Sequence, residues 1–118
     1  MELTYDDLED GIRVIKLKGR LDLEGSGSID LKFTMLTATG KFLVVADLSD
    51  VEFMASIGLA TLVRNAKAAR LRGGQMVVLG PRPNVAAVFA STRIDQVIPV
   101  CTTLDEARQQ LRHPPAAV

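Results

Sequence analysis

The stretch that decides the fold runs from Phe42 to Leu59 and joins an apolar run, a polar segment and the start of a helix. It reads Phe42-Leu43-Val44-Val45-Ala46-Asp47-Leu48-Ser49-Asp50-Val51-Glu52-Phe53-Met54-Ala55-Ser56-Ile57-Gly58-Leu59. The continuous apolar run at its start is typical of a central strand that is covered on both faces. Residues 47–50 then predict a polar turn. Ser56 is a predicted helix N-cap, because its hydroxyl oxygen can accept an amide hydrogen of the first turn.

Downstream of this stretch, helices and strands continue to alternate. An amphipathic helix is predicted after Ser56, with Gly73-Gly74 ending it. Its apolar stripe comprises Leu59, Leu62, Val63, Ala66 and Ala69, and its basic outer face carries Arg64, Lys67, Arg70 and Arg72. The remaining predicted elements are a strand over Met76–Leu79, a helix over Asn84–Ser91, a short edge strand over Val97–Val100 and a helix over Thr103–Arg112. The last helix opens with the Thr103 and Glu106 spacing of a capping box.

Upstream, the pattern predicts a hairpin and one helix. Strands are expected over Leu3–Leu8 and Ile12–Leu17, joined by the turn dipeptide Asp10-Gly11. A helix is expected within Leu23–Thr39, starting nearer Ser28 and ending at Gly40 as C-cap. The order β-β-α-β-α-β-α-β-α predicts an α/β domain. Its sheet should be mixed and mostly parallel, with an N-terminal antiparallel hairpin strand and about four helices.

Length and composition restrict the function. The 118 residues suit one domain over residues 1–112, followed by a flexible tail over residues 113–118. The 14 basic and 14 acidic residues balance, which disfavours binding to nucleic acid. The chain has no apolar run long enough to insert into a membrane, and its acidic start is unlike a secretory signal. We therefore expect a cytoplasmic protein.

The chain offers few groups for catalysis or metal binding. Cys101 is the only cysteine, so no intrachain disulfide can form, and His113 is the only histidine. A zinc site built mainly from cysteine and histidine is excluded on these counts. Hydrolytic or transfer chemistry needs a base, and none is evident. We expect no metal, no cofactor and no enzymatic activity, and we interpret Cys101 as a small buried side chain.

Three ordered motifs resemble the STAS domains of bacterial anti-sigma-factor antagonists. In that family a strand ending in Asp-Leu-Ser leads to Phe-Met-Asp-Ser-Ser-Gly-Leu and a helix. This chain has Asp47-Leu48-Ser49 and, after three further residues, Phe53-Met54-Ala55-Ser56-Ile57-Gly58-Leu59. Gly19-Arg20-Leu21-Asp22 is similar to the family's Gly-Glu-Leu-Asp, and Gly73-Gly74 before a strand is similar to its Gly-Gly. The resemblance covers about residues 2–112.

The resemblance implies a partner-switching regulator of transcription. In the family, the anti-sigma factor is a serine kinase of the histidine-kinase-like ATPase fold, and it phosphorylates the serine at the position of Ser56. A metal-dependent serine phosphatase reverses this step. The unphosphorylated protein binds the kinase and frees the sigma factor or another client. The implied partner-binding residues are Asp22, Met54, Ala55, Ile57, Gly58 and Leu59.

Two positions depart from the family motif. Ala55 stands where an acidic residue commonly precedes the phosphoserine, and Ile57 stands where a serine commonly follows it. Both changes bear on which kinase recognises Ser56. The local alternatives are that Ser56 is only a helix cap, that Asp22 is a solvated turn residue and that the basic helix face is merely solvated. Gly58 is interpreted as a close-packing residue.

Other functions remain open at this level. The chain could be a constitutive STAS subunit that docks on a transporter or a lipid-trafficking ATPase, or a sensor of a small ligand or nucleotide. A switch requires an exposed Ser56, a docking subunit requires a larger exposed apolar surface, and a sensor requires a pocket at the strand ends. The oligomeric state is expected to be a monomer or a weak homodimer.

Overall fold

One five-stranded sheet organises the computed structural model, which describes residues 1–39 and 43–112. The strands lie in the order β1 (Glu2–Asp7), β2 (Ile12–Leu21), β3 (Leu43–Met54), β4 (Gln75–Leu79) and β5 (Val100–Cys101). β1 is antiparallel to β2, and every other neighbouring pair is parallel. The predicted mixed sheet with an N-terminal antiparallel strand is therefore confirmed.

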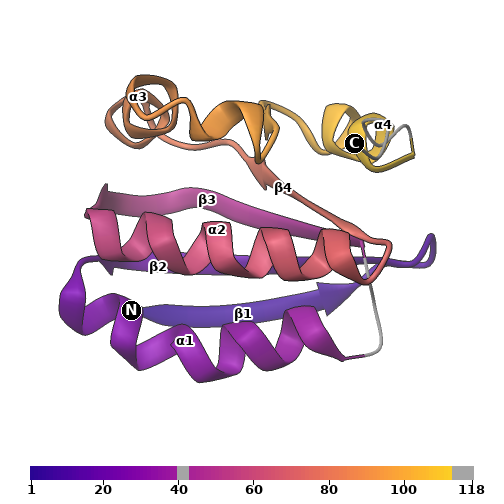
Figure 1. Ribbon diagram of the computed structural model, residues 1–118, viewed down its shortest axis with the longest axis horizontal. Helices are drawn as coiled ribbons and strands as arrows, with labels where there is room; N and C mark the ends of the chain where they lie inside the picture. The colour runs from indigo at the N-terminus through magenta and orange to yellow at the C-terminus, as the bar shows by residue number, and fades with distance from the viewer. Residues whose placement is uncertain (40–42, 113–118) are drawn as a thin grey trace.

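The helices cover both faces of the sheet. They are α1 (Leu23–Ala38), α2 (Ser56–Leu71), α3 (Pro83–Ser91), the short 3-10 helix η1 (Ile94–Gln96) and α4 (Leu104–Arg112). α1 and α2 run side by side over one face (Figure 1). The core on that face includes Phe33, Leu62 and Phe89, whereas Val45, Val77 and Leu111 form a second cluster under α4. Successive strand residues point to opposite faces, so β3 contributes to both clusters.

β3 is longer than the sequence indicates. Residues 47–50, which we predicted as a polar turn, lie within the strand, which continues to Met54. Leu48 and Val51 are fully buried, and the intervening polar residues point outward. β2 pairs with β3 along this whole extension, with two register shifts between Lys16 and Arg20, whereas β4 pairs with β3 only as far as Asp47. The turn prediction was wrong because this long-range pairing outweighs local polarity.

α1 begins at Leu23, not near Ser28 as expected. Asp22 caps it, and Gly25 in its first turn is packed closely against β2, whereas a β-carbon on Gly27 would meet nothing within 4 Å. The amide of Thr39 donates to the Met35 carbonyl oxygen at 3.1 Å, and Thr39 itself is extended. The predicted C-cap Gly40, the strand residue Phe42 and the tail over residues 113–118 lie outside the described residues.

The C-terminal elements follow the prediction with one correction. The edge strand predicted over Val97–Val100 is only Val100–Cys101, and η1 over residues 94–96, which precedes it, was not predicted. Pro99 lacks an amide hydrogen, although its carbonyl oxygen accepts from the Val78 amide at 2.9 Å. In α4 the Thr103 hydroxyl oxygen accepts from the Glu106 amide at 3.1 Å, and the Glu106 carboxylate accepts from the Thr102 amide at 3.2 Å. The predicted capping pair is thus confirmed, with the return bond shifted by one residue.

Candidate functional site

The site lies where β2 and β3 end together, beyond the end of β4. Leu21, the last residue of β2, is paired with Met54, the last residue of β3. The Ala55 amide then donates to the Leu21 carbonyl oxygen at 2.9 Å. α1 and α2 therefore start next to each other at one edge of the sheet. The carboxyl ends of parallel strands are where α/β folds present their functional groups.

The start of α2 leaves the Ser56 hydroxyl exposed. Ala55 is the N-cap, because its carbonyl oxygen accepts from the amides of Gly58 and Leu59 at 3.0 and 3.1 Å. The predicted cap role of Ser56 is therefore wrong. Ser56 is the first helical residue, and no side chain caps this helix. Its hydroxyl is exposed on the surface and is not needed to start the helix.

Three of the residues implied in partner binding hold the start of α2 in place. A β-carbon on Gly58 would lie 2.7 Å from the Leu21 carbonyl oxygen, so only glycine allows α2 to approach β2 this closely. This confirms the close-packing interpretation of Gly58. Met54 and Leu59 are both buried in the core beneath it. Ile57, by contrast, is 42% exposed, and it is available to a partner beside Ser56.

Asp22 starts α1 and keeps part of its carboxylate exposed. Its Oδ1 accepts from the Gly25 amide at 2.8 Å, and its Oδ2 lies 3.6 Å from the Arg20 Nε. The Gly25 amide, and then Arg20, hold the pKa of the Asp22 carboxyl below its ordinary value. Asp22 is thus a helix cap and more than a solvated turn residue. Its part in partner binding stays a prediction.

Arg20 and Phe53 belong to the same edge, and the sequence analysis assigned them no role. The register pairs these residues across β2 and β3, and the Arg20 guanidinium lies 4.5 Å from the centre of the Phe53 ring. Both side chains are exposed. A cation over an aromatic face is a favourable contact, so the pair gives the edge a fixed, partly apolar rim. Their pairing depends on the two register shifts between β2 and β3, which have no clear sequence pattern.

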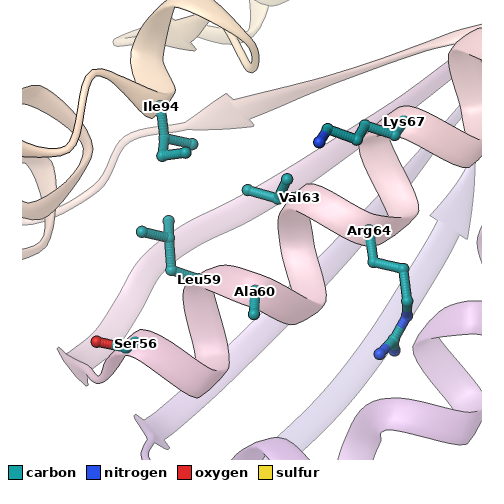
Figure 2. Close-up of a pocket in the computed structure, with 7 residues that line it drawn as sticks. All are labelled: Ser56, Leu59, Ala60, Val63, Arg64, Lys67 and Ile94. Carbon is teal, nitrogen blue, oxygen red and sulfur yellow. The ribbon is translucent and has the colours of Figure 1, made fainter.

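An open groove extends from Ser56 along α2 (Figure 2). Its volume is about 510 Å³, and it is lined by Ser56, Leu59, Ala60, Val63, Arg64, Lys67 and Ile94. The close-up shows Ser56 at one end and Lys67 toward the other, with Leu59 and Val63 directed toward Ile94. Sequence reasoning missed Ile94, because η1 is distant from α2 along the chain.

The basic face of α2 is partly used within the protein. Arg64 forms an ion pair with Asp30 of α1, and Arg72 donates to the Thr37 carbonyl oxygen at 3.1 Å. These contacts tie α2 to α1, so the interpretation of a merely solvated face is incomplete. Lys67 lines the groove and gives it a cationic end.

Chemistry other than surface binding has little support among the described residues. Cys101 is buried, as predicted, and its burial, with a smaller effect of Glu106, raises the pKa of its thiol. A raised pKa disfavours the reactive thiolate. Within residues 1–39 and 43–112, no group of three or more histidine, cysteine or acidic side chains could hold a metal ion. No helix in that part of the chain is long and apolar enough to cross a membrane.

The chain belongs to the STAS domain family, which matches residues 7–107. A relative from Bordetella bronchiseptica, named "Putative anti-sigma factor antagonist BtrV", is 26% identical over 107 residues, which is 91% of each chain. The crystal structure of an anti-sigma factor antagonist from Mycobacterium paratuberculosis has a TM-score of 0.79 at 25% identity, covering 94% of this chain and 93% of that one. Unphosphorylated SpoIIAA has the same fold, with a TM-score of 0.76 at 21% identity and coverage of 97% and 99%. These similarities support the general role of an anti-sigma factor antagonist.

Proposed function

We propose that this chain is a phosphorylation-controlled anti-sigma factor antagonist that acts in the cytoplasm. In its unphosphorylated form it binds an anti-sigma factor that is also a serine kinase of the histidine-kinase-like ATPase fold. Phosphorylation of Ser56 releases it, and a metal-dependent serine phosphatase restores it. The observation that carries this proposal is the exposed Ser56 hydroxyl, which stands at the start of α2 without serving as its cap.

The position of Ser56 allows a phosphate to be added without unfolding the protein. The first amides of a helix have no acceptor within the helix, and no side chain caps them at α2. The positive end of the helix dipole also favours an anion there. SpoIIAA, which shares the fold, has a structure in its phosphorylated form, with a TM-score of 0.70 to this chain. We therefore expect phosphorylation to change recognition and to leave the fold intact.

The surroundings of Ser56 explain how a phosphate would oppose binding. Ile57 is exposed next to it, and the apolar floor of the groove begins at Leu59. A phosphate adds roughly 1.5 to 2 negative charges, which a partner covering these apolar side chains would have to desolvate. The exposed Ile57 also offers the kinase an apolar contact where the common family motif has a serine.

The test is phosphorylation by purified serine kinases of the ATPase fold from the source organism, with ATP and phosphosite mass spectrometry. We expect phosphate on Ser56, with Ser56→Ala unmodified and Ser91→Ala, which removes another exposed serine, modified like the wild type. Modification by an active kinase at another residue only would contradict the proposal.

Binding to the same kinase gives the second measurement. Ser56→Ala should bind like the wild type, and Ser56→Asp should bind roughly 5- to 100-fold more weakly, equivalent to about 1 to 3 kcal/mol. Because Ser56 is not the cap, Ser56→Ala should change the free energy of unfolding by less than about 0.5 kcal/mol. Equal affinities of the two variants would argue for a constitutive docking subunit instead.

A further inference from the structure

The outer face of α1 carries a row of apolar residues that the rest of the described chain does not cover. Leu23, Gly27, Leu31 and Met35 follow one another at intervals of four residues, which places them in one row along the helix. We call this row the α1 stripe. Its three large side chains are 72%, 75% and 56% exposed, in chain order. Ile29, Phe33 and Leu36 on the inner face are buried. Large apolar side chains that lie exposed in one row mark a candidate contact surface.

We propose that the α1 stripe is the contact surface between two copies of this chain, packed with their α1 helices antiparallel. A contact of this kind is isologous, so the same patch serves both copies and the assembly closes at two. The stripe lies on α1, whereas η1 lies beyond α2 as seen from α1 (Figure 1), and the groove is lined by residues of α2 and by Ile94 of η1. The inference is therefore independent of the function proposed for Ser56.

Charge complementarity selects a second copy of this chain in this orientation. Glu24 and Lys32 are exposed, and each lies four residues from Ser28. With the two-fold axis at the level of Ser28, Glu24 of one copy is level with Lys32 of the second copy, and the reverse pair forms by symmetry. A parallel arrangement in register would instead place Glu24 against Glu24 and Lys32 against Lys32. Such like-charge contacts oppose association.

The same alignment interleaves the apolar side chains. Leu31 of one copy lies between the levels of Leu23 and Gly27 of the second copy. Leu23 lies between the levels of Leu31 and Met35 of the second copy. Gly27 provides the gap that Leu31 needs, because a β-carbon added there would meet nothing within 4 Å.

Little polar surface has to be desolvated at the centre of this contact. The Ser28 hydroxyl, close to the axis, already donates to the Gly25 carbonyl oxygen at 2.7 Å. α1 has 16 residues and is therefore about 24 Å long. A single pair of helices of this length buries less surface than a standard interface, so we expect a reversible dimer with a micromolar dissociation constant.

Sedimentation equilibrium of the full chain, from about 1 to 500 μM, tests the proposal. We expect the wild type to pass from monomer to dimer in this range, and Leu31→Glu to raise the dissociation constant by at least about tenfold. Leu71→Glu is the matched control: Leu71 is an 89% exposed leucine at the end of α2, on a different helix from the stripe. It should dimerise like the wild type. Circular dichroism melting confirms that each variant is folded.

A charge exchange tests the antiparallel register. Glu24→Lys and Lys32→Glu should each weaken the dimer, and the two substitutions together should restore it, because the complementary pairs re-form with reversed sign. A wild type that stays monomeric at 500 μM, equal effects of Leu31→Glu and Leu71→Glu, or a double variant as weak as the single ones would each overturn the proposal. Monomeric wild type would leave the α1 stripe open to a different protein.

Discussion

The starts of α1 and α2 have nearly the same backbone and very different side chains. Asp22 and Ala55 are the two N-caps, with φ and ψ of −93° and −168° for Asp22 and −91° and 168° for Ala55. Both helices begin at the same edge of the sheet, after β2 and β3. Asp22 caps its helix with a carboxylate, whereas Ala55 offers no side-chain cap and is followed by the exposed Ser56. The Asp22 carboxylate therefore occupies an amide at the start of α1, whereas the amides at the start of α2 remain available to an added anion.

The two starts also share a glycine at the third helical position. A β-carbon on Gly25 would lie 1.9 Å from the Arg20 carbonyl oxygen, and one on Gly58 would lie 2.7 Å from the Leu21 carbonyl oxygen. Both of these oxygens belong to the backbone of β2, so they cannot move aside as the end of a side chain could. The glycines thus fix how closely each helix approaches the strand, and through this the position of Asp22 and Ser56.

Gly25→Ala should disrupt this shared geometry, and we expect it to cause the largest loss of stability. The clash with the Arg20 carbonyl should lower the free energy of unfolding by about 2 to 4 kcal/mol. Gly27→Ala, two residues later in the same helix, is the matched control, because its β-carbon meets nothing within 4 Å. It should raise stability by about 0.5 to 1 kcal/mol. Urea unfolding at low protein concentration measures both. Equal destabilisation would show that the packing against β2 is not the cause.

A smaller effect is expected for Ala55→Asp, which would give α2 the cap that α1 has. Because Ala55 already has the backbone conformation of Asp22, the new carboxylate should accept an amide hydrogen of the first turn. Stability should rise by about 1 kcal/mol. Ala60→Asp places the same side chain at an exposed position further along α2 and should not stabilise the protein. Equal changes in thermal or urea unfolding would contradict a cap at residue 55.

The smallest effect, and the one that depends on pH, is expected for Asp22→Asn. The folded-state pKa of Asp22 is lowered, so its carboxylate stabilises the fold above the unfolded-state pKa of about 4. This contribution is lost as the pH falls through the lower folded-state pKa. Asparagine keeps an oxygen acceptor for the Gly25 amide, so the comparison isolates the charge. The melting temperature of the variant should lie slightly below that of the wild type at neutral pH. The difference should shrink as the pH falls below about 4, and a constant difference would contradict this account.

The order of helices and strands and the mixed sheet could be predicted from the sequence, whereas Ser56 was singled out as a candidate switch only by its resemblance to the family motif. These features depend on local patterns: the apolar run before Asp47, the helical spacing after Ser56 and the capping pair of Thr103 and Glu106. The close packing of Gly58 was also predicted correctly, because a glycine early in a helix after a strand suggests a close backbone approach. Such patterns act over a few residues, where side-chain chemistry and backbone preference agree.

Only the tertiary structure decided which residue caps each helix and what surrounds Ser56. Because β3 pairs with β2 through its polar segment, the strand continues to Met54. The N-cap of α2 is therefore Ala55, and not Ser56 as the sequence predicted. The same pairing joins Arg20 to Phe53, and the path of the chain through η1 brings Ile94 to the groove. These contacts join residues far apart in sequence, through a shifted strand register and the packing of separate elements. No local pattern specifies such contacts, so the exposed hydroxyl of Ser56 follows from the assembled sheet.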